Sequence, residues 1–265
     1  MKTKSMKIFG LDFSHDPVGS TVAAICDAVE HEIEGWKYAF FDSALADRTS
    51  HIGESDVREY LSLVRFHPEA EYIARIKQFS MLHTDALMLL RLFACASKLP
   101  ILEIGPYVGG STVAISRGLR VSGRGLPLIS IEAGGSYTDH PHVPSMDIIG
   151  DLKRRIADAS VQDIVRVVAG HSRDASVVHE VRDALAGQRI GMIFIDADGN
   201  VDQDWEIYRE LISHDAIVVL DDYVSDIATE KATQVKPWVD RMVAANHLRS
   251  LGVHGWGTWF GQVIG

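Results

Sequence analysis

Three aspartates carry the clearest chemistry in this sequence. Asp196 follows one short apolar run, and Asp221 with Asp222 follows another that ends at Leu220. If both runs are neighbouring parallel strands, these carboxylates meet at one edge of a sheet, and we expect no Lys or Arg near them there. Converging carboxylates repel one another unless they are protonated or bind a metal such as Mg²⁺. The pattern predicts a divalent-cation site, with ordinary loop capping as the alternative.

A glycine-rich turn follows an earlier apolar run, Ile101 to Ile104. Gly105, Gly109 and Gly110 would let backbone amides approach a ligand, and Ser111 and Thr112 suit the start of a helix, where free amides attract anionic groups. The spacing Gly-x-x-x-Gly-Gly fits a pyrophosphate less well than Gly-x-Gly-x-x-Gly does. The turn therefore predicts a small polar cofactor other than a dinucleotide, and a plain strand-to-helix turn is the alternative.

Polar groups follow two further apolar runs. Glu132 stands where a carboxylate could accept both hydroxyl protons of a ribose. The turn Gly170-His171-Ser172-Arg173 could meet an adenine edge, or Ser172 could cap the next helix.

The run pattern predicts a doubly wound α/β fold from about residue 100 onward. Short β-branched runs alternate with helical segments, which is typical of a mostly parallel sheet. The expected strands lie near 100–105, 127–132, 164–169, 191–196, 215–220, 247–253 and 257–264, and the expected helices near 111–120, 147–159, 173–186, 202–212 and 227–245. Only a short Gly-Trp-Gly connection separates the last two strands, so they must be antiparallel neighbours.

Residues 1–99 have a different pattern. Helical periodicity runs from Asp56 to Phe66, from Glu69 to Phe79 and from Met81 to Ala96, with no strand pattern of similar strength. We expect two regions, a helical lid or flank over 1–99 and a cofactor-binding domain over 100–265. Packing of the first region on a distant face, or its use in homo-oligomer formation, is the alternative.

Composition limits the partners and the compartment. The 265 residues carry a net charge of −10 and contain no long Lys/Arg run, which argues against nucleic acid. The only cysteines, Cys26 and Cys95, are too few for a disulfide scaffold. Polar residues break the N-terminal apolar stretch, and no run approaches membrane-spanning length. We expect a cytoplasmic protein that binds a small molecule, without nucleic acid or membrane.

Taken together, these motifs resemble the class I S-adenosylmethionine (SAM)-dependent methyltransferases. Within them they are similar to the divalent-metal-dependent small-molecule O-methyltransferases of the catechol, caffeoyl-CoA and antibiotic-sugar types. The resemblance covers about residues 98–264. It implies a seven-stranded Rossmann-like fold, SAM and Mg²⁺ or a similar cation as cofactors, and methyl transfer to a hydroxyl of a small molecule.

The resemblance also assigns residues. The methionine part of SAM would contact Glu103, Gly105, Tyr107, Gly109 and Ser111. The ribose would contact Glu132, the adenine Gly170, Ser172 and Arg173, and the metal Asp196, Asp221 and Asp222.

One position departs from the family pattern. These relatives commonly carry a Lys or His as general base three residues after the first metal aspartate, and here that residue is Gly199. Two routes for the proton stay open: transfer to water or Asp198 from a metal-activated hydroxyl, or transfer to His140 or His142 from the loop after Glu132. We expect metal activation to dominate. A gain in rate from Gly199→His would mean that the acceptor lies where it does in the relatives.

Two other function classes compete with this interpretation. A catalytically silent SAM-binding or regulatory protein is favoured by Gly199 and disfavoured by the intact aspartates. A nucleotide-dependent oxidoreductase is disfavoured by the glycine spacing and by the terminal pair of strands.

Overall fold

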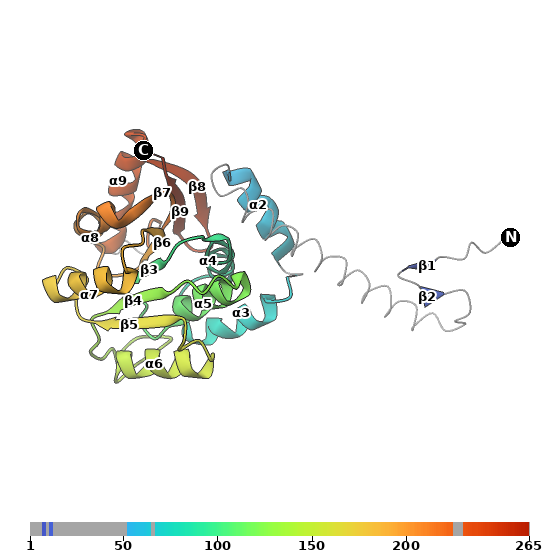
Figure 1. The fold of residues 1–265 in the computed structure, drawn as a ribbon, viewed down its shortest axis with the longest axis horizontal. Coiled ribbons are helices and arrows are strands. Elements are labelled where there is room, and N and C mark those ends of the chain that lie inside the picture. Colours follow the sequence, from blue (N-terminus) through green and yellow to red (C-terminus); the bar gives the residue numbers. More distant parts are fainter. Residues whose placement is uncertain (1–6, 9–10, 13–51, 65–66, 225–229, 265) are drawn as a thin grey trace.

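One mixed sheet organises the computed structural model, which describes residues 7–8, 11–12, 52–64, 67–224 and 230–264 (Figure 1). Its seven strands lie in the order β5-β4-β3-β6-β7-β9-β8. Their bounds are β3 Ile101–Ile104, β4 Leu128–Glu132, β5 Val165–Ala169, β6 Ile190–Ile195, β7 Ile212–Leu220, β8 Leu248–His254 and β9 Thr258–Val263. All seven expected strands are confirmed, with ends that shift by a few residues.

The strand directions also agree with the sequence. β3 pairs in parallel with β4 and β6, β4 with β5, and β6 with β7, whereas β9 runs antiparallel to both β7 and β8. The short connection Gly255–Gly257 joins β8 to β9 as expected. The chain therefore has the Rossmann-like arrangement in which the last strand runs against the others.

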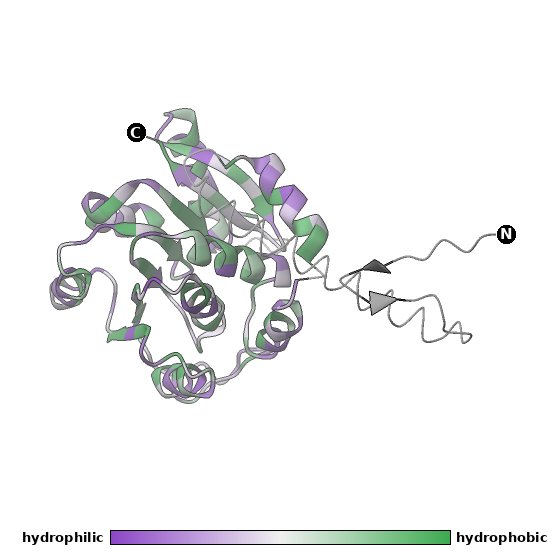
Figure 2. Ribbon diagram, turned by 45° about the vertical axis from the view of Figure 1, so that its right-hand side comes forward, coloured by the Kyte–Doolittle hydropathy of each residue, from purple (hydrophilic) through white to green (hydrophobic). Residues whose placement is uncertain are grey.

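Helices cover both faces of this sheet because the strand side chains alternate between two hydrophobic cores. In β6, Met192 and Phe194 face the core that contains α4 and α5, while Ile193 and Ile195 face the core that contains α7, α8 and α9. The helix bounds are α4 Thr84–Ala96, α5 Gly110–Ser122, α6 Ile148–Asp158, α7 Ala175–Leu185, α8 Val201–Tyr208 and α9 Glu230–Ala244. Figure 2 shows the same pattern: the strands are mostly hydrophobic, and the helices carry both hydrophobic and hydrophilic residues.

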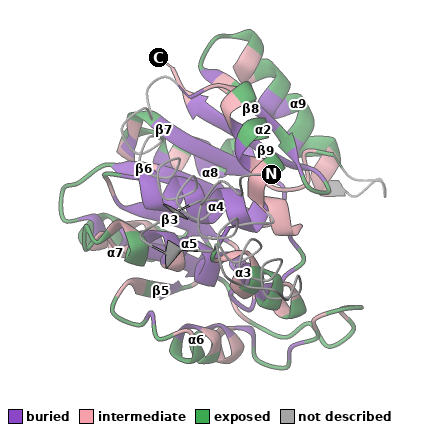
Figure 3. Cartoon of the chain, turned by 90° about the vertical axis from the view of Figure 1, so that its right-hand side faces the viewer, coloured by how far each residue is buried: buried purple, intermediate pink, exposed green. Residues whose placement is uncertain are grey.

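The N-terminal region contains three of the helices expected there. They are α2 Glu54–Leu63, α3 Ala70–Ile76 with the short 3₁₀ helix Lys77–Phe79, and α4. Two-residue strands β1 Lys7–Ile8 and β2 Leu11–Asp12 were not expected from the sequence. Helix α4 is almost wholly buried in the sheet core (Figure 3), so a boundary at residue 99 does not separate two cores.

In the described part of the chain, no single helix combines the length and the apolar character of a membrane span. Only the bent pair of segments Ala70–Phe79 and Thr84–Ala96, at 118° to each other, passes that test jointly.

The contact between α4 and α5 depends on Gly118. A Cβ at this position would lie 2.1 Å from the carbonyl oxygen of Arg91 and 2.9 Å from the Cβ of Ala94. We expect Gly118→Ala to lower the free energy of unfolding by about 2 kcal/mol, because one of two packed helices must move. Urea denaturation measures this loss.

A matched control is Gly123→Ala, where nothing lies within 4 Å and only the positive φ of 64° opposes a side chain. This variant should lose about 1 kcal/mol. Equal losses in the two variants would contradict the packing argument.

Candidate active site

A cavity of about 510 Å³ opens at the carboxyl ends of the central parallel strands. Residues from the glycine turn, from the ends of β4, β5, β6 and β7, and from the start of α9 line it. Among the described residues of the N-terminal region, the segment Phe79–Leu82 lines it. The sequence-predicted residues in its lining are Gly105, Tyr107, Ser111, Glu132, His140, Gly170, Ser172, Arg173, Asp196, Asp198, Asp221 and Asp222.

The glycine turn is pressed against the end of β6. Gly105 has φ +83°, and a Cβ there would lie 2.2 Å from the carbonyl oxygen of Asp196. The Asp196 amide in turn donates to the carbonyl of Ile104 at 2.9 Å. A side chain at position 105 would therefore separate the cofactor turn from the strand that carries the first aspartate.

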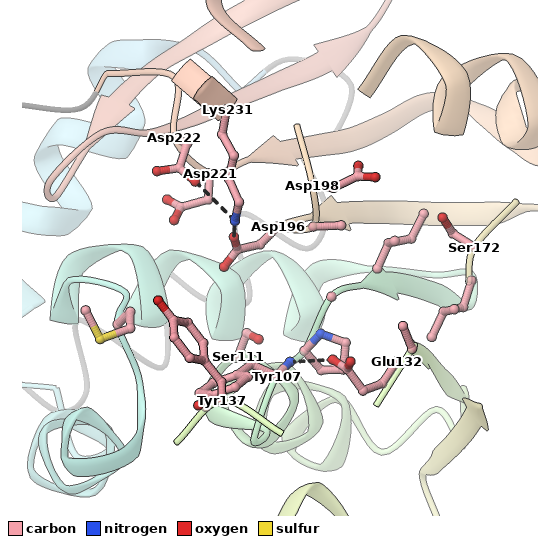
Figure 4. Close-up of a pocket in the computed structure, with 18 of the residues that line it drawn as sticks. Tyr107, Ser111, Glu132, Tyr137, Ser172, Asp196, Asp198, Asp221, Asp222 and Lys231 are labelled. Atoms are coloured by element: carbon pink, nitrogen blue, oxygen red, sulfur yellow. Dashed lines mark hydrogen bonds and ion pairs between the residues drawn. The ribbon is translucent and has the colours of Figure 1, made fainter. Parts of the chain in front are cut away.

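Glu132 holds the glycine turn from the neighbouring strand. Its Oε2 accepts the backbone amide of Tyr107 at 2.9 Å (Figure 4). Its Oε1 accepts the backbone amide of Gly134 at 2.9 Å. Burial raises the pKa of this carboxyl, and these backbone hydrogen bonds oppose that rise. Glu132 is thus a fixed acceptor at the cavity wall, suited to a further pair of hydroxyl donors.

Two sequence-predicted cofactor contacts lie behind the turn rather than in the cavity lining. Glu103 is fully buried, and its Oε2 accepts the hydroxyls of Thr112 at 2.7 Å and Ser130 at 2.6 Å. Gly109, at φ +96°, precedes α5 and faces Leu152. Both residues support the turn from the side that faces away from the cavity. This geometry therefore disfavours direct contact of Glu103 or Gly109 with a ligand.

The turn after β5 has its polar groups already engaged. Ser172 Oγ donates to Asp204 at 2.6 Å, and its carbonyl accepts the Tyr208 hydroxyl at 2.5 Å. Arg173 donates to Asp198 at 2.6 Å. The Ser172 hydroxyl proton therefore points to the protein interior, and contact of Ser172 and Arg173 with an adenine stays a prediction.

Asp198 is a weak proton acceptor in this arrangement. The hydrogen bond from Arg173 holds the pKa of its carboxyl far below the usual range. Among the acceptors left open by the sequence, the ion pair with Arg173 therefore disfavours Asp198.

The three metal-type aspartates do converge. One carboxylate oxygen each from Asp196, Asp221 and Asp222 lies within 4.8 Å of the other two. Burial, then the neighbouring Asp221 charge, raises the pKa of Asp196 well above its usual value. Burial also raises the pKa of Asp221, although the Thr258 hydroxyl donates to it at 2.6 Å. This clustering of hard oxygen donors fits a divalent cation.

A lysine that the sequence did not point to joins this cluster. Lys231 Nζ lies 3.5 Å from Asp196 Oδ1 and 3.5 Å from Asp222 Oδ2, as the dashed lines in Figure 4 show. Burial alone would lower the pKa of Lys231, but the surrounding carboxylates raise it above its usual value. The expectation that no Lys or Arg stands near the aspartates is therefore wrong.

Lys231 also explains why position 199 is a glycine. The residue has φ +87°, and a Cβ there would lie 2.9 Å from the Cα of Lys231. Because that neighbour is backbone, Gly199→His would strain the loop and push against α9. Gly199→His would therefore change the loop as well as add a base, so its rate is not a clean test of where the acceptor lies.

The histidine loop is ordered by its own contacts. His140 Nδ1 accepts the backbone amides of His142 and Val143 at 3.3 and 3.0 Å. Its ring stacks on Tyr107, with centroids 5.4 Å apart, and meets Tyr137 edge-on. Burial lowers the pKa of His140. His140 thus lines the cavity with one ring nitrogen engaged, whereas His142 is exposed and outside the lining.

Comparison with known proteins agrees with this architecture. Residues 102–223 match the family model described as a methyltransferase domain. A search of the curated proteins gives no match. Among solved structures, the O-methyltransferase TomG from Streptomyces achromogenes, in complex with SAM, shares 19% identity over 80% of this chain and 97% of its own, with a TM-score of 0.54.

Two further structures have the same fold. An O-methyltransferase from Bacillus cereus in complex with S-adenosylhomocysteine (SAH) shares 18% identity over 84% of this chain and 96% of its own, with a TM-score of 0.54. The SAH-bound methyltransferase PaMTH1 of Podospora anserina shares 17% over 95% and 99%, with a TM-score of 0.52. Residues 102–223 are therefore similar to a methyltransferase domain, and the chain has the Rossmann-like fold of these solved structures.

Proposed function

We propose that this protein transfers the methyl group of SAM to a hydroxyl oxygen of a small molecule. One observation carries the proposal: a single cavity joins the braced carboxylate Glu132 to the cluster of Asp196, Asp221 and Asp222. The first end suits a nucleoside, and the second suits an oxygen that must lose a proton. The match of this region to a methyltransferase domain supports joining the two.

The cofactor would lie across the glycine turn. Glu132 would accept the ribose hydroxyls, Gly105, Tyr107 and Ser111 would meet the methionine part, and Gly170 with Arg173 would border the adenine. TomG in complex with SAM and the Bacillus cereus enzyme in complex with SAH support this choice of cofactor. The methyl group would then point toward the aspartates.

Asp196, Asp221 and Asp222 would hold Mg²⁺ or a similar cation. When bound, such a cation supplies Lewis-acid stabilisation of a deprotonated hydroxyl. The residues of the chain align the acceptor for in-line displacement, in which the new O–C bond forms as the S–C bond breaks. The hydroxyl proton leaves to water, because Asp198 is held by Arg173 and position 199 has no side chain.

A direct experiment incubates the pure protein with methyl-labelled SAM, MgCl₂ and a panel of aromatic diols, sugars and polyketides. We expect the labelled methyl group to appear in at least one hydroxylated compound. SAH binding without transfer to any of them would favour the silent SAM-binding protein, for which Gly199 argues.

The histidine loop gives a second test of the proton path. His140→Ala and His142→Ala should each lower turnover less than tenfold, short of the ~10²–10⁴-fold loss typical of a general base. The reason is that His140 Nδ1 already accepts two backbone amides and His142 is exposed. Steady-state rates at saturating SAM measure the effect. A hundredfold loss at normal SAH affinity would instead assign the proton to this loop.

A further inference from the structure

Gly199 and Lys231 are complementary in space. A Cβ on Gly199 would lie 2.9 Å from Cα, 3.3 Å from Cβ and 3.4 Å from Cγ of Lys231. The first turn of α9 therefore fills the place into which a side chain at 199 would project. The position three residues after Asp196 is not simply vacant, since another element supplies a side chain there.

The ammonium of Lys231 is aimed at the reactive end of the cavity. Figure 4 shows it reaching between Asp196 and Asp222, and the residue lines the cavity. Its two 3.5 Å contacts are longer than the ~2.7–2.9 Å typical of a charge-assisted hydrogen bond. An ammonium has three N–H donors, so donor capacity is left for a ligand oxygen.

The other cation in the described lining is already committed. Arg173 donates to Asp198 at 2.6 Å, on the side of the cavity given to the nucleoside. Among the described Lys and Arg residues, Lys231 is the one that the cavity places beside the aspartates.

We propose that Lys231 is a catalytic residue whose ammonium donates a hydrogen bond to the acceptor oxygen. This inference rests on the proposed methyl transfer. As the O–C bond forms and the S–C bond breaks, the hydroxyl proton passes to water and Lys231 keeps its own protons. Its fixed positive charge stabilises the negative charge that develops on the oxygen.

The same charge is compatible with a bound cation. With all three carboxylates ionised, the cluster and Lys231 together carry two net negative charges, which one divalent cation balances. The ammonium and the cation can therefore serve one acceptor oxygen from two sides.

The test uses 4-nitrocatechol, a coloured diol that the nitro group keeps largely ionised at neutral pH. The full-length protein is saturated with SAH and MgCl₂ and titrated by absorbance. We expect the wild type to bind the probe and Lys231→Met to bind it at least tenfold more weakly. Lys231→Arg, which retains the charge, should lose threefold at most.

Lys236→Met is the matched control, because Lys236 lies on the same helix but pairs with Asp240 at 2.7 Å outside the cavity. It should bind the probe within twofold of the wild type. Calorimetry should give SAH affinities within twofold for all variants. Mn²⁺ should bind Lys231→Met several-fold more tightly, because a positive charge next to two ligands is gone. Lys231→Gln replaces the Met variant if that one does not fold.

The inference and the proposed function fail separately. Equal probe binding by Lys231→Met and wild type, or none by a wild type that binds SAH and Mn²⁺, would overturn the role of Lys231 and leave methyl transfer standing. A wild-type protein that does not bind SAH would overturn the proposed function itself.

Discussion

Asp221→Ala is expected to lower methyl transfer by at least ~10²–10³-fold, the loss typical of removing a group that stabilises developing charge. Asp221 is one of three carboxylates within 4.8 Å of one another, so its loss would leave only Asp196 and Asp222 of this cluster to hold a divalent cation. The affinity for SAH should stay within twofold, because the cofactor end of the cavity rests on other strand ends. Turnover with labelled SAM and calorimetry with SAH measure the two effects.

The control for this variant is Asp158→Ala, an exposed aspartate at the end of α6, which should behave as the wild type. Excess chelator should abolish wild-type turnover, and Mg²⁺ should restore it. Full activity of the wild type in chelator would refute metal dependence. Full activity of Asp221→Ala would remove this aspartate from the site.

Glu132→Ala should weaken binding of SAH by about 1–3 kcal/mol, through loss of charge-assisted hydrogen bonds to the ribose. A second cause adds to this, since the Tyr107 and Gly134 amides lose the carboxylate that holds the turn. Calorimetric titration of the variant with SAH gives the loss directly.

Two variants separate these causes. Glu132→Gln keeps one carbonyl acceptor and should bind SAH more tightly than Glu132→Ala. Glu180→Ala, an exposed residue paired with Arg166 at 3.2 Å, should match the wild type. Unchanged SAH affinity in Glu132→Ala would exclude Glu132 from the cofactor site.

The sheet could be predicted from sequence because its strands are short apolar runs bounded by turn residues. Asp196 and Asp221 directly follow the last residues of β6 and β7. The apolar runs that predicted these strands therefore also located the candidate site. The glycine spacing predicted the turn after β3, and the short β8–β9 connection predicted the antiparallel last strand. Local pattern was sufficient wherever the chemistry sits at a strand end.

Contacts between elements distant in sequence were not predictable. Lys231 lies on a helix 32 residues beyond Gly199, and only the folded chain brings the two together. No spacing rule links them, although Gly199 in place of a base was a sign that another side chain was needed. The same holds for Ser172, whose hydroxyl is taken by Asp204 from α8.

The sequence pattern also did not show how deeply a residue is buried. Glu103 has the sequence position of a cofactor contact, but Thr112 and Ser130 bind it inside the protein. Helix α4 belongs to the region expected to form a lid or flank, and its apolar residues continue around most of the helix, which packs in the core. An apolar surface on all sides, rather than a stripe, was the available signal for this burial.

The central claim is that the cavity beside Glu132 binds SAM. Isothermal titration of the wild-type protein with SAH tests it most directly, with NAD as the comparison ligand. We expect a single SAH site of low-micromolar affinity or tighter, and no heat with NAD. Absence of SAH binding, or tighter binding of NAD, would contradict it.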